Sequence, residues 1–194
     1  MPDHSPALLR TPSDDAVVEA TKNWLQKAVI GLNLCPFAKA VDRKNQIRYV
    51  VSAATDRDVL ASDLAAELSW LHASAPDVID TTLLIHPHVL GDFFDYNGFL
   101  PEANRIVKRL GLTGKIQIAT FHPHYEFADC PSDAIENYTN RAPYQMLHLL
   151  RESSIERAVT AFPDAADIYK NNIETMRALG EDGWQAIWSS SVRS

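Results

Sequence analysis

Residues 81–89, TTLLIHPHV, and residues 116–125, IQIATFHPHY, are the stretches that decide the fold. Each begins with aliphatic and β-branched side chains and ends in or just after the tripeptide His-Pro-His. An apolar run without alternation, such as Leu83–Ile85, is typical of a strand covered on both faces. We therefore predict buried strands over 79–85 and 115–121, and a histidine pair leaves the sheet after each of them.

The segments around these two strands alternate between helix and strand. Residues 47–52, IRYVVS, predict a further strand, and helices are expected over 16–32, 55–73 and 101–110. Because crossovers of this length favour parallel neighbours, the order predicts an α/β domain with a small, three-stranded, mainly parallel sheet packed by helices. An antiparallel, ferredoxin-like α+β arrangement is the alternative.

The chain becomes helical beyond residue 131. We expect five helices there, over 132–138, 144–153, 155–162, 165–179 and 182–189. Met176, Trp184 and Trp188 indicate that the last part docks on the core. Residues 1–13, which contain three prolines, are expected to form a mobile tail. Residues 14–194 then form a single globular domain with a helical C-terminal extension from about residue 132.

Composition excludes several classes of partner. The 194 residues carry a formal net charge of −7, whereas nucleic-acid binders normally present a basic face. No apolar run reaches the roughly 18 residues of a membrane span, and the first residues lack the pattern of a secretory signal. Two cysteines without an export signal indicate reduced thiols. We therefore expect a cytoplasmic protein whose partner is a small-molecule substrate, not nucleic acid or a membrane.

The paired histidines form the first candidate site. They are His86, His88, His122 and His124. Strands that end at one sheet edge bring such pairs together, and the intervening prolines stiffen them. Imidazole is the commonest metal ligand and the usual proton carrier near neutral pH. With a carboxylate from Glu126 or Asp92, these histidines are candidate ligands for zinc or iron and candidate catalytic groups. Hydrogen bonding to neighbouring backbone is the structural alternative.

Cys35 is a further candidate catalytic residue. It precedes Pro36, which favours a helix start, and a thiol at a helix N-terminus gains thiolate character. The segment Cys-Pro-Phe-Ala is similar to the active-site segment of some glutathione transferases and glutaredoxins. Those families place the cysteine after a strand, whereas an amphipathic helix precedes it here, so we reject a thioredoxin-like fold. A buried, inert cysteine is the alternative.

A third group of residues suits an anionic substrate. Asn140 and Arg141 precede a predicted helix start at Tyr144, and His148 and Arg151 would share one face of that helix. A guanidinium fork matches carboxylate or phosphate, so these residues are candidate substrate-binding groups. Pairing of the arginines with nearby glutamates on a solvated face is the alternative.

Short motifs spread along the chain carry a family resemblance. They lie at residues 33–38, 85–88, 95–97, 121–125, 140–144 and 147–151. Together they resemble a bacterial family of unknown function, domain-of-unknown-function family 1415, over roughly residues 16–179. The resemblance implies a complete single-domain protein but no activity.

Three functions follow as hypotheses. The first is an enzyme that acts on a small anionic molecule through the paired histidines, with metal-dependent hydrolysis as the reaction. The second is a thiol-based enzyme that uses Cys35. The third is a non-catalytic accessory protein that binds a ligand or a metal.

Overall fold

A computed structural model describes residues 12–161 and 167–192 and shows an α/β fold around a four-stranded sheet. The strands are β1 (Ile47–Val51), β2 (Thr81–Ile85), β3 (Ile116–Phe121) and β4 (Met146–Arg151). Their order is β1-β2-β4-β3; β1 and β2 are parallel, and β4 is antiparallel to both of its neighbours. The predicted α/β class is confirmed, but the predicted three-stranded, mainly parallel sheet is wrong in strand number and in direction.

Strand β4 is the element for which the sequence predicts a helix instead. Its residues MLHLLR are mostly good helix formers without β-branching, so local propensity favours the helix expected over 144–153. The strand lies between β2 and β3, and apolar side chains are needed on both of its faces. Tertiary packing therefore overrides local propensity in this segment.

Strands β2 and β3 run in the same direction, because each is antiparallel to β4. Both His-Pro-His motifs consequently leave the sheet at the same edge, as predicted. The start of β4 separates the two exits, since Met146 pairs with Ile85 on one side and with Phe121 on the other.

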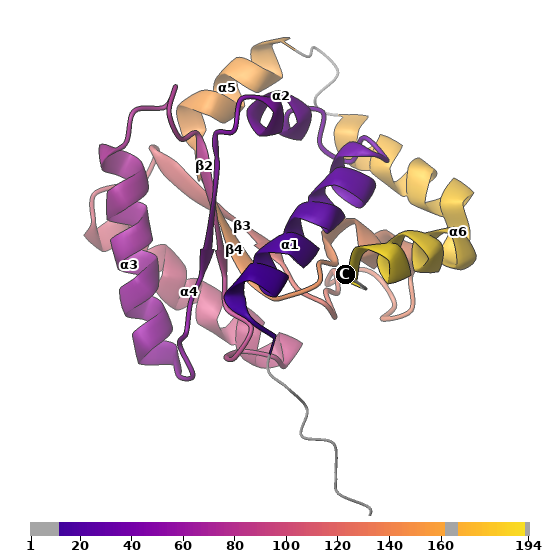
Figure 1. The fold of residues 1–194 in the computed structure, drawn as a ribbon, viewed down its shortest axis with the longest axis horizontal. Coiled ribbons are helices and arrows are strands. Elements are labelled where there is room, and N and C mark those ends of the chain that lie inside the picture. The colour runs from indigo at the N-terminus through magenta and orange to yellow at the C-terminus, as the bar shows by residue number, and fades with distance from the viewer. Residues whose placement is uncertain (1–11, 162–166, 193–194) are drawn as a thin grey trace, which may run out of the picture.

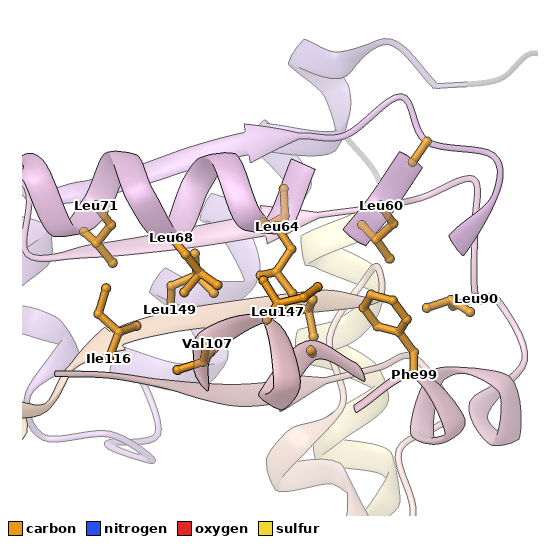
Figure 2. Close-up of a cluster of buried hydrophobic side chains, with 14 of the residues drawn as sticks. Leu60, Leu64, Leu68, Leu71, Leu90, Phe99, Val107, Ile116, Leu147 and Leu149 are labelled. Carbon is orange, nitrogen blue, oxygen red and sulfur yellow. The ribbon is translucent and has the colours of Figure 1, made fainter. Parts of the chain in front are cut away.

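Helices α3 (Arg57–Ala73) and α4 (Phe93–Arg109) cover one face of the sheet (Figure 1). Figure 2 shows the leucine stripe of α3 directed toward Leu147 and Leu149 of β4. The stripe consists of Leu60, Leu64, Leu68 and Leu71, all fully buried. The helix predicted over 55–73 is thus confirmed, and its leucine stripe fills the core on this side of the sheet.

Helix α4 begins well before the start expected at residue 101. Asp92 caps it, because its carboxylate accepts hydrogen bonds from the backbone N–H groups of Phe94 (2.9 Å) and Asp95 (3.1 Å). Pro101 lies inside the helix and is exposed, and water can satisfy the carbonyl that loses its helical donor there. The proline therefore does not mark the helix start.

The opposite face of the sheet is covered by the N-terminal helices, and the C-terminal helix packs on these (Figure 1). They are α1 (Asp14–Trp24), its π-helical continuation η1 (Leu25–Ile30), α2 (Ala38–Arg43) and α6 (Ile168–Val192). Trp24, Met176 and Trp184 are buried in one apolar cluster with Leu83 and Ile85 of β2. The predicted docking of the C-terminal part on the core is confirmed.

The remaining elements are η2 (Ile135–Asn140), a 3-10 helix, and α5 (Glu152–Ala161). Gly180, with φ of 67°, interrupts α6 at the point where two separate helices are predicted. Residues 162, 165 and 166 of the predicted helices lie outside the described residues.

The predicted N-terminal tail, residues 1–13, lies almost entirely outside the described residues, which begin at Pro12. Ser13 belongs to the fold, because its side chain caps α1 by accepting a hydrogen bond from the N–H of Ala16 (3.3 Å).

Candidate functional site: an apolar cavity over the sheet

The first histidine of each His-Pro-His motif is buried and hydrogen-bonded to backbone. His86 directs Nδ1 to the carbonyl of Val89 at 3.0 Å, so this nitrogen carries the hydrogen. Its Nε2 is buried and has no hydrogen-bond partner among the described residues. Burial lowers the pKa of His86 to about 4, which keeps the ring neutral near pH 7.

His122 uses both of its ring nitrogens within the protein. Nε2 donates to the carbonyl of Leu90 (3.3 Å), and Nδ1 accepts a hydrogen bond from the backbone N–H of His124 (3.0 Å). Burial lowers the pKa of this ring as well. No lone pair of His122 is therefore free for a metal ion in this arrangement.

The structure brings the two buried histidines together and leaves the other two at the surface. Tyr96 lies between the buried pair, with ring centroids 5.8 Å from His86 and 5.1 Å from His122. His88 and His124 are exposed, as is Glu126. Across residues 12–161 and 167–192, no group of three or more His, Cys, Asp or Glu side chains is placed to hold a metal ion.

Asn140 binds the end of β3, and Arg141 binds the loop that follows this strand. Asn140 donates to the carbonyl of Thr120 (3.1 Å), and Arg141 donates to the carbonyl of Ser132 (3.0 Å). The guanidinium group of Arg141 also stacks on the ring of Tyr138, with its central carbon 4.0 Å from the ring centroid. These contacts give both residues a structural role in holding the loop.

Arg151 and His148 lie on opposite faces of β4, so the predicted shared helix face is wrong. Side chains three positions apart point to opposite sides of a strand, whereas they would share a side on a helix. Arg151 lies on the α3 side and donates to backbone carbonyls near the end of that helix. His148 lies on the α1 side and takes part in a different site.

A cavity of about 920 Å³ lies on the α1 side of the sheet and has His148 on its floor. Strands β2, β3 and β4 form this floor, where Leu83, His148 and Ala119 stand side by side in register. The walls come from η1, the segment before α2, α2 itself and α5; they include Val29, Cys35, Val41, Ile155 and Ala158. The lining is mainly apolar, and the volume falls within the range of small-molecule sites.

Charged residues occur at the outer part of this lining. Lys44, Asp77 and Arg157 are exposed, and Arg157 lies 3.8 Å from the carboxylate of Asp80. The floor contains none of these charged side chains, and among the described residues His148 is its one titratable side chain. The cavity therefore has one imidazole on an apolar floor, and its charged residues lie in the walls and at the mouth, with Asp80 largely buried there.

His148 has a defined hydrogen-bond partner. Its Nε2 lies 2.7 Å from the hydroxyl oxygen of Thr81, and that hydroxyl lies 2.6 Å from the carbonyl of Leu149. Burial among apolar groups lowers the pKa of His148 to about 4. The imidazole is consequently neutral near pH 7, and a neutral ring offers a ligand hydrogen bonding without charge.

Cys35 lines the same cavity and is half-buried. Burial raises the pKa of its thiol, and hydrogen bonds from the backbone of Phe37 and Ala38 only partly oppose this shift. The thiolate character predicted for a helix N-terminus is thus outweighed by desolvation, because α2 is short and begins at Ala38. Cys130, the other free cysteine, is not among the lining residues.

Sequence motifs point to His148 and Cys35, but not to the residues that join them into one cavity. Thr81 and Ala119 carry no functional motif, and only the pairing of β4 with β2 and β3 places them beside His148. The sequence MLHLLR of β4 shows no apolar–polar alternation, so it contains no local signal that identifies the strand.

Fold and cavity together define a three-layer α/β protein with a ligand-sized apolar cavity over the middle of its sheet. The chain belongs to the DUF1415 family, described as proteins of unknown function, whose sequence profile matches residues 16–186. The family resemblance seen in the sequence is thereby confirmed. No curated protein and no solved structure matches the chain. None of the helices in the described part of the chain has the length and apolar character needed to cross a membrane.

Proposed function

We propose that the protein binds a small, predominantly apolar molecule in the cavity over β2, β4 and β3. The observation that supports this proposal is the 920 Å³ space with an apolar floor that contains a single imidazole. Concave apolar sites with few polar groups are the usual form of small-molecule sites. We place the binding site in this cavity and not at the His-Pro-His motifs, because both ring nitrogens of His122 already form hydrogen bonds with the backbone.

The proposed site differs from the anionic-substrate site expected from sequence. Arg141 and Arg151 bind backbone carbonyls elsewhere, so neither provides a cation beside His148. A carboxylate on the cavity floor would lose its hydration and meet apolar side chains and a neutral ring. An uncharged ligand body is therefore the better match.

Binding of Nile red, a neutral dye without hydrogen-bond donors, tests this proposal. We expect saturable binding with increased fluorescence, and we expect Ala119→Phe to weaken it at least tenfold, because the new ring occupies the floor beside His148. Ala66→Phe adds the same ring to an exposed position of α3, across the sheet, and is the matched control. Equal affinity of Ala119→Phe and wild type, with both folded by circular dichroism, would contradict the proposal.

Thiol chemistry in the same cavity is a second candidate function, because Cys35 and His148 both line it. The raised pKa of Cys35 lowers the fraction of thiolate, so we expect its thiol to react slowly with electrophiles. In a Cys130→Ser background we expect iodoacetamide to alkylate Cys35 at least tenfold more slowly in the folded than in the unfolded protein. Alkylation faster than in the unfolded chain, and lost in His148→Phe, would favour the thiol enzyme instead.

A further inference from the structure

The hydrogen positions around His148 follow from the chemistry of its partners. The carbonyl of Leu149 can only accept, so at 2.6 Å it must receive the hydrogen of the Thr81 hydroxyl. A hydroxyl has one hydrogen, and Thr81 therefore accepts in its 2.7 Å contact with His148 Nε2. The hydrogen of the neutral imidazole is thus on Nε2, and the lone pair is on Nδ1.

The lone pair on Nδ1 is available to a ligand. Nδ1 of His148 has no hydrogen-bond partner among the described residues, and, unlike Nε2 of His86, it is not closed off by protein atoms. The ring lines the cavity between Leu83 and Ala119, neither of which has a side-chain donor. A donor for Nδ1 must therefore come from the contents of the cavity.

We infer that the cavity selects a ligand with an uncharged O–H or N–H group, which donates a hydrogen bond to Nδ1 of His148. This inference rests on the proposed binding function and narrows its ligand class to apolar molecules with a neutral donor, such as phenols, alcohols or amides. Thr81 has a positioning role, because its hydroxyl orients the ring and fixes which nitrogen keeps the lone pair.

Neighbouring threonines of β2 provide a matched pair of variants. Thr81 faces the cavity, whereas Thr82 faces the α3 side, where its hydroxyl is buried without a partner. Thr81→Val removes the oxygen that accepts the hydrogen bond from Nε2 of His148. The hydrogen of the imidazole is then no longer held on Nε2 and can also occupy Nδ1. Thr82→Val makes the same change in shape without touching His148.

The test compares 2-naphthol with 2-methoxynaphthalene as competitors of Nile red at neutral pH. The two probes share an apolar body, and only the naphthol donates a hydrogen bond. We expect wild type and Thr82→Val to bind 2-naphthol about tenfold more tightly than the ether. In His148→Phe the ratio of the two affinities should approach one, and in Thr81→Val it should fall below the wild-type ratio. The anion 2-naphthoate should bind wild type more weakly than 2-naphthol.

The outcomes separate this inference from the binding function. Equal affinities of wild type for 2-naphthol and its ether, or tighter binding of 2-naphthoate, would overturn the inference and leave the apolar cavity function in place. A preference for 2-naphthol that persists in His148→Phe, or that stays at the wild-type ratio in Thr81→Val, would also overturn it. If neither these probes nor Nile red bind, the binding function itself fails.

Discussion

Replacing Arg151 with methionine is expected to lower the free energy of unfolding by about 3–5 kcal/mol. The guanidinium group is buried and donates from one nitrogen to the carbonyls of Leu71 (2.5 Å), Ser74 (2.7 Å) and Ile79 (3.2 Å). These carbonyls lie at the end of α3 and in the segment that leads into β2. Methionine fills much of the volume but cannot donate, so the charge-assisted hydrogen bonds of this nitrogen, whose two hydrogens are shared among the three carbonyls, are lost together.

Arg157→Met is the matched control for this stability measurement. Arg157 is exposed and lies 3.8 Å from Asp80, and an exposed ion pair of this kind contributes less than about 1 kcal/mol. Urea unfolding monitored by tryptophan fluorescence measures both variants. If Arg151→Met loses no more unfolding free energy than Arg157→Met, the hydrogen bonds from Arg151 to the end of α3 do not stabilise the fold.

The second large effect is a loss of stability in acid that is caused by His86. Burial lowers the pKa of this ring in the folded protein to about 4, compared with about 6.5 in the unfolded chain. Between these two values the unfolded chain binds the proton more strongly, so stability is complete above about pH 6.5 and is lost as the pH falls toward 4. The contribution of His86 to this loss is on the order of 3 kcal/mol.

His86→Asn tests this expectation. Asparagine keeps a donor in the place of Nδ1, within reach of the Val89 carbonyl, but cannot be protonated. The fall in unfolding free energy between neutral and acid pH should therefore be smaller in this variant than in wild type, whatever its stability at neutral pH. His88→Asn makes the same exchange at an exposed ring, and the wild-type loss should persist there. If the free energy of unfolding falls equally with pH in His86→Asn and in wild type, His86 does not cause the loss of stability in acid.

The elements that the sequence predicts well are those whose local pattern agrees with their packing. The leucine stripe of α3 and the aliphatic run of β2 each indicate the correct structure, because the helical spacing of the one and the unbroken apolar run of the other agree with their burial. The common sheet edge for His86 and His122 is also correct, although it was derived from a parallel sheet and arises from β4 running antiparallel to both strands.

The candidate site is harder to predict from the sequence, because its residues are brought together by the pairing of β4 with β2 and β3. A helix over 144–153 would place His148 beside Arg151, whereas the strand separates them and brings His148 beside Leu83 and Ala119. The repeated His-Pro-His motif has the stronger sequence signal, yet its buried rings bind backbone carbonyls of the loop after β2. Long-range strand pairing is not encoded in local propensity, and so the cavity could not be derived from short motifs.

A map of backbone amide chemical shifts during a Nile red titration tests the central claim most directly. The proposed function predicts saturable shifts centred on Thr81, Ala119 and His148, across the three strands that form the floor of the cavity. Shifts centred on His88 and His124 at the sheet edge, with the floor unchanged, would contradict it.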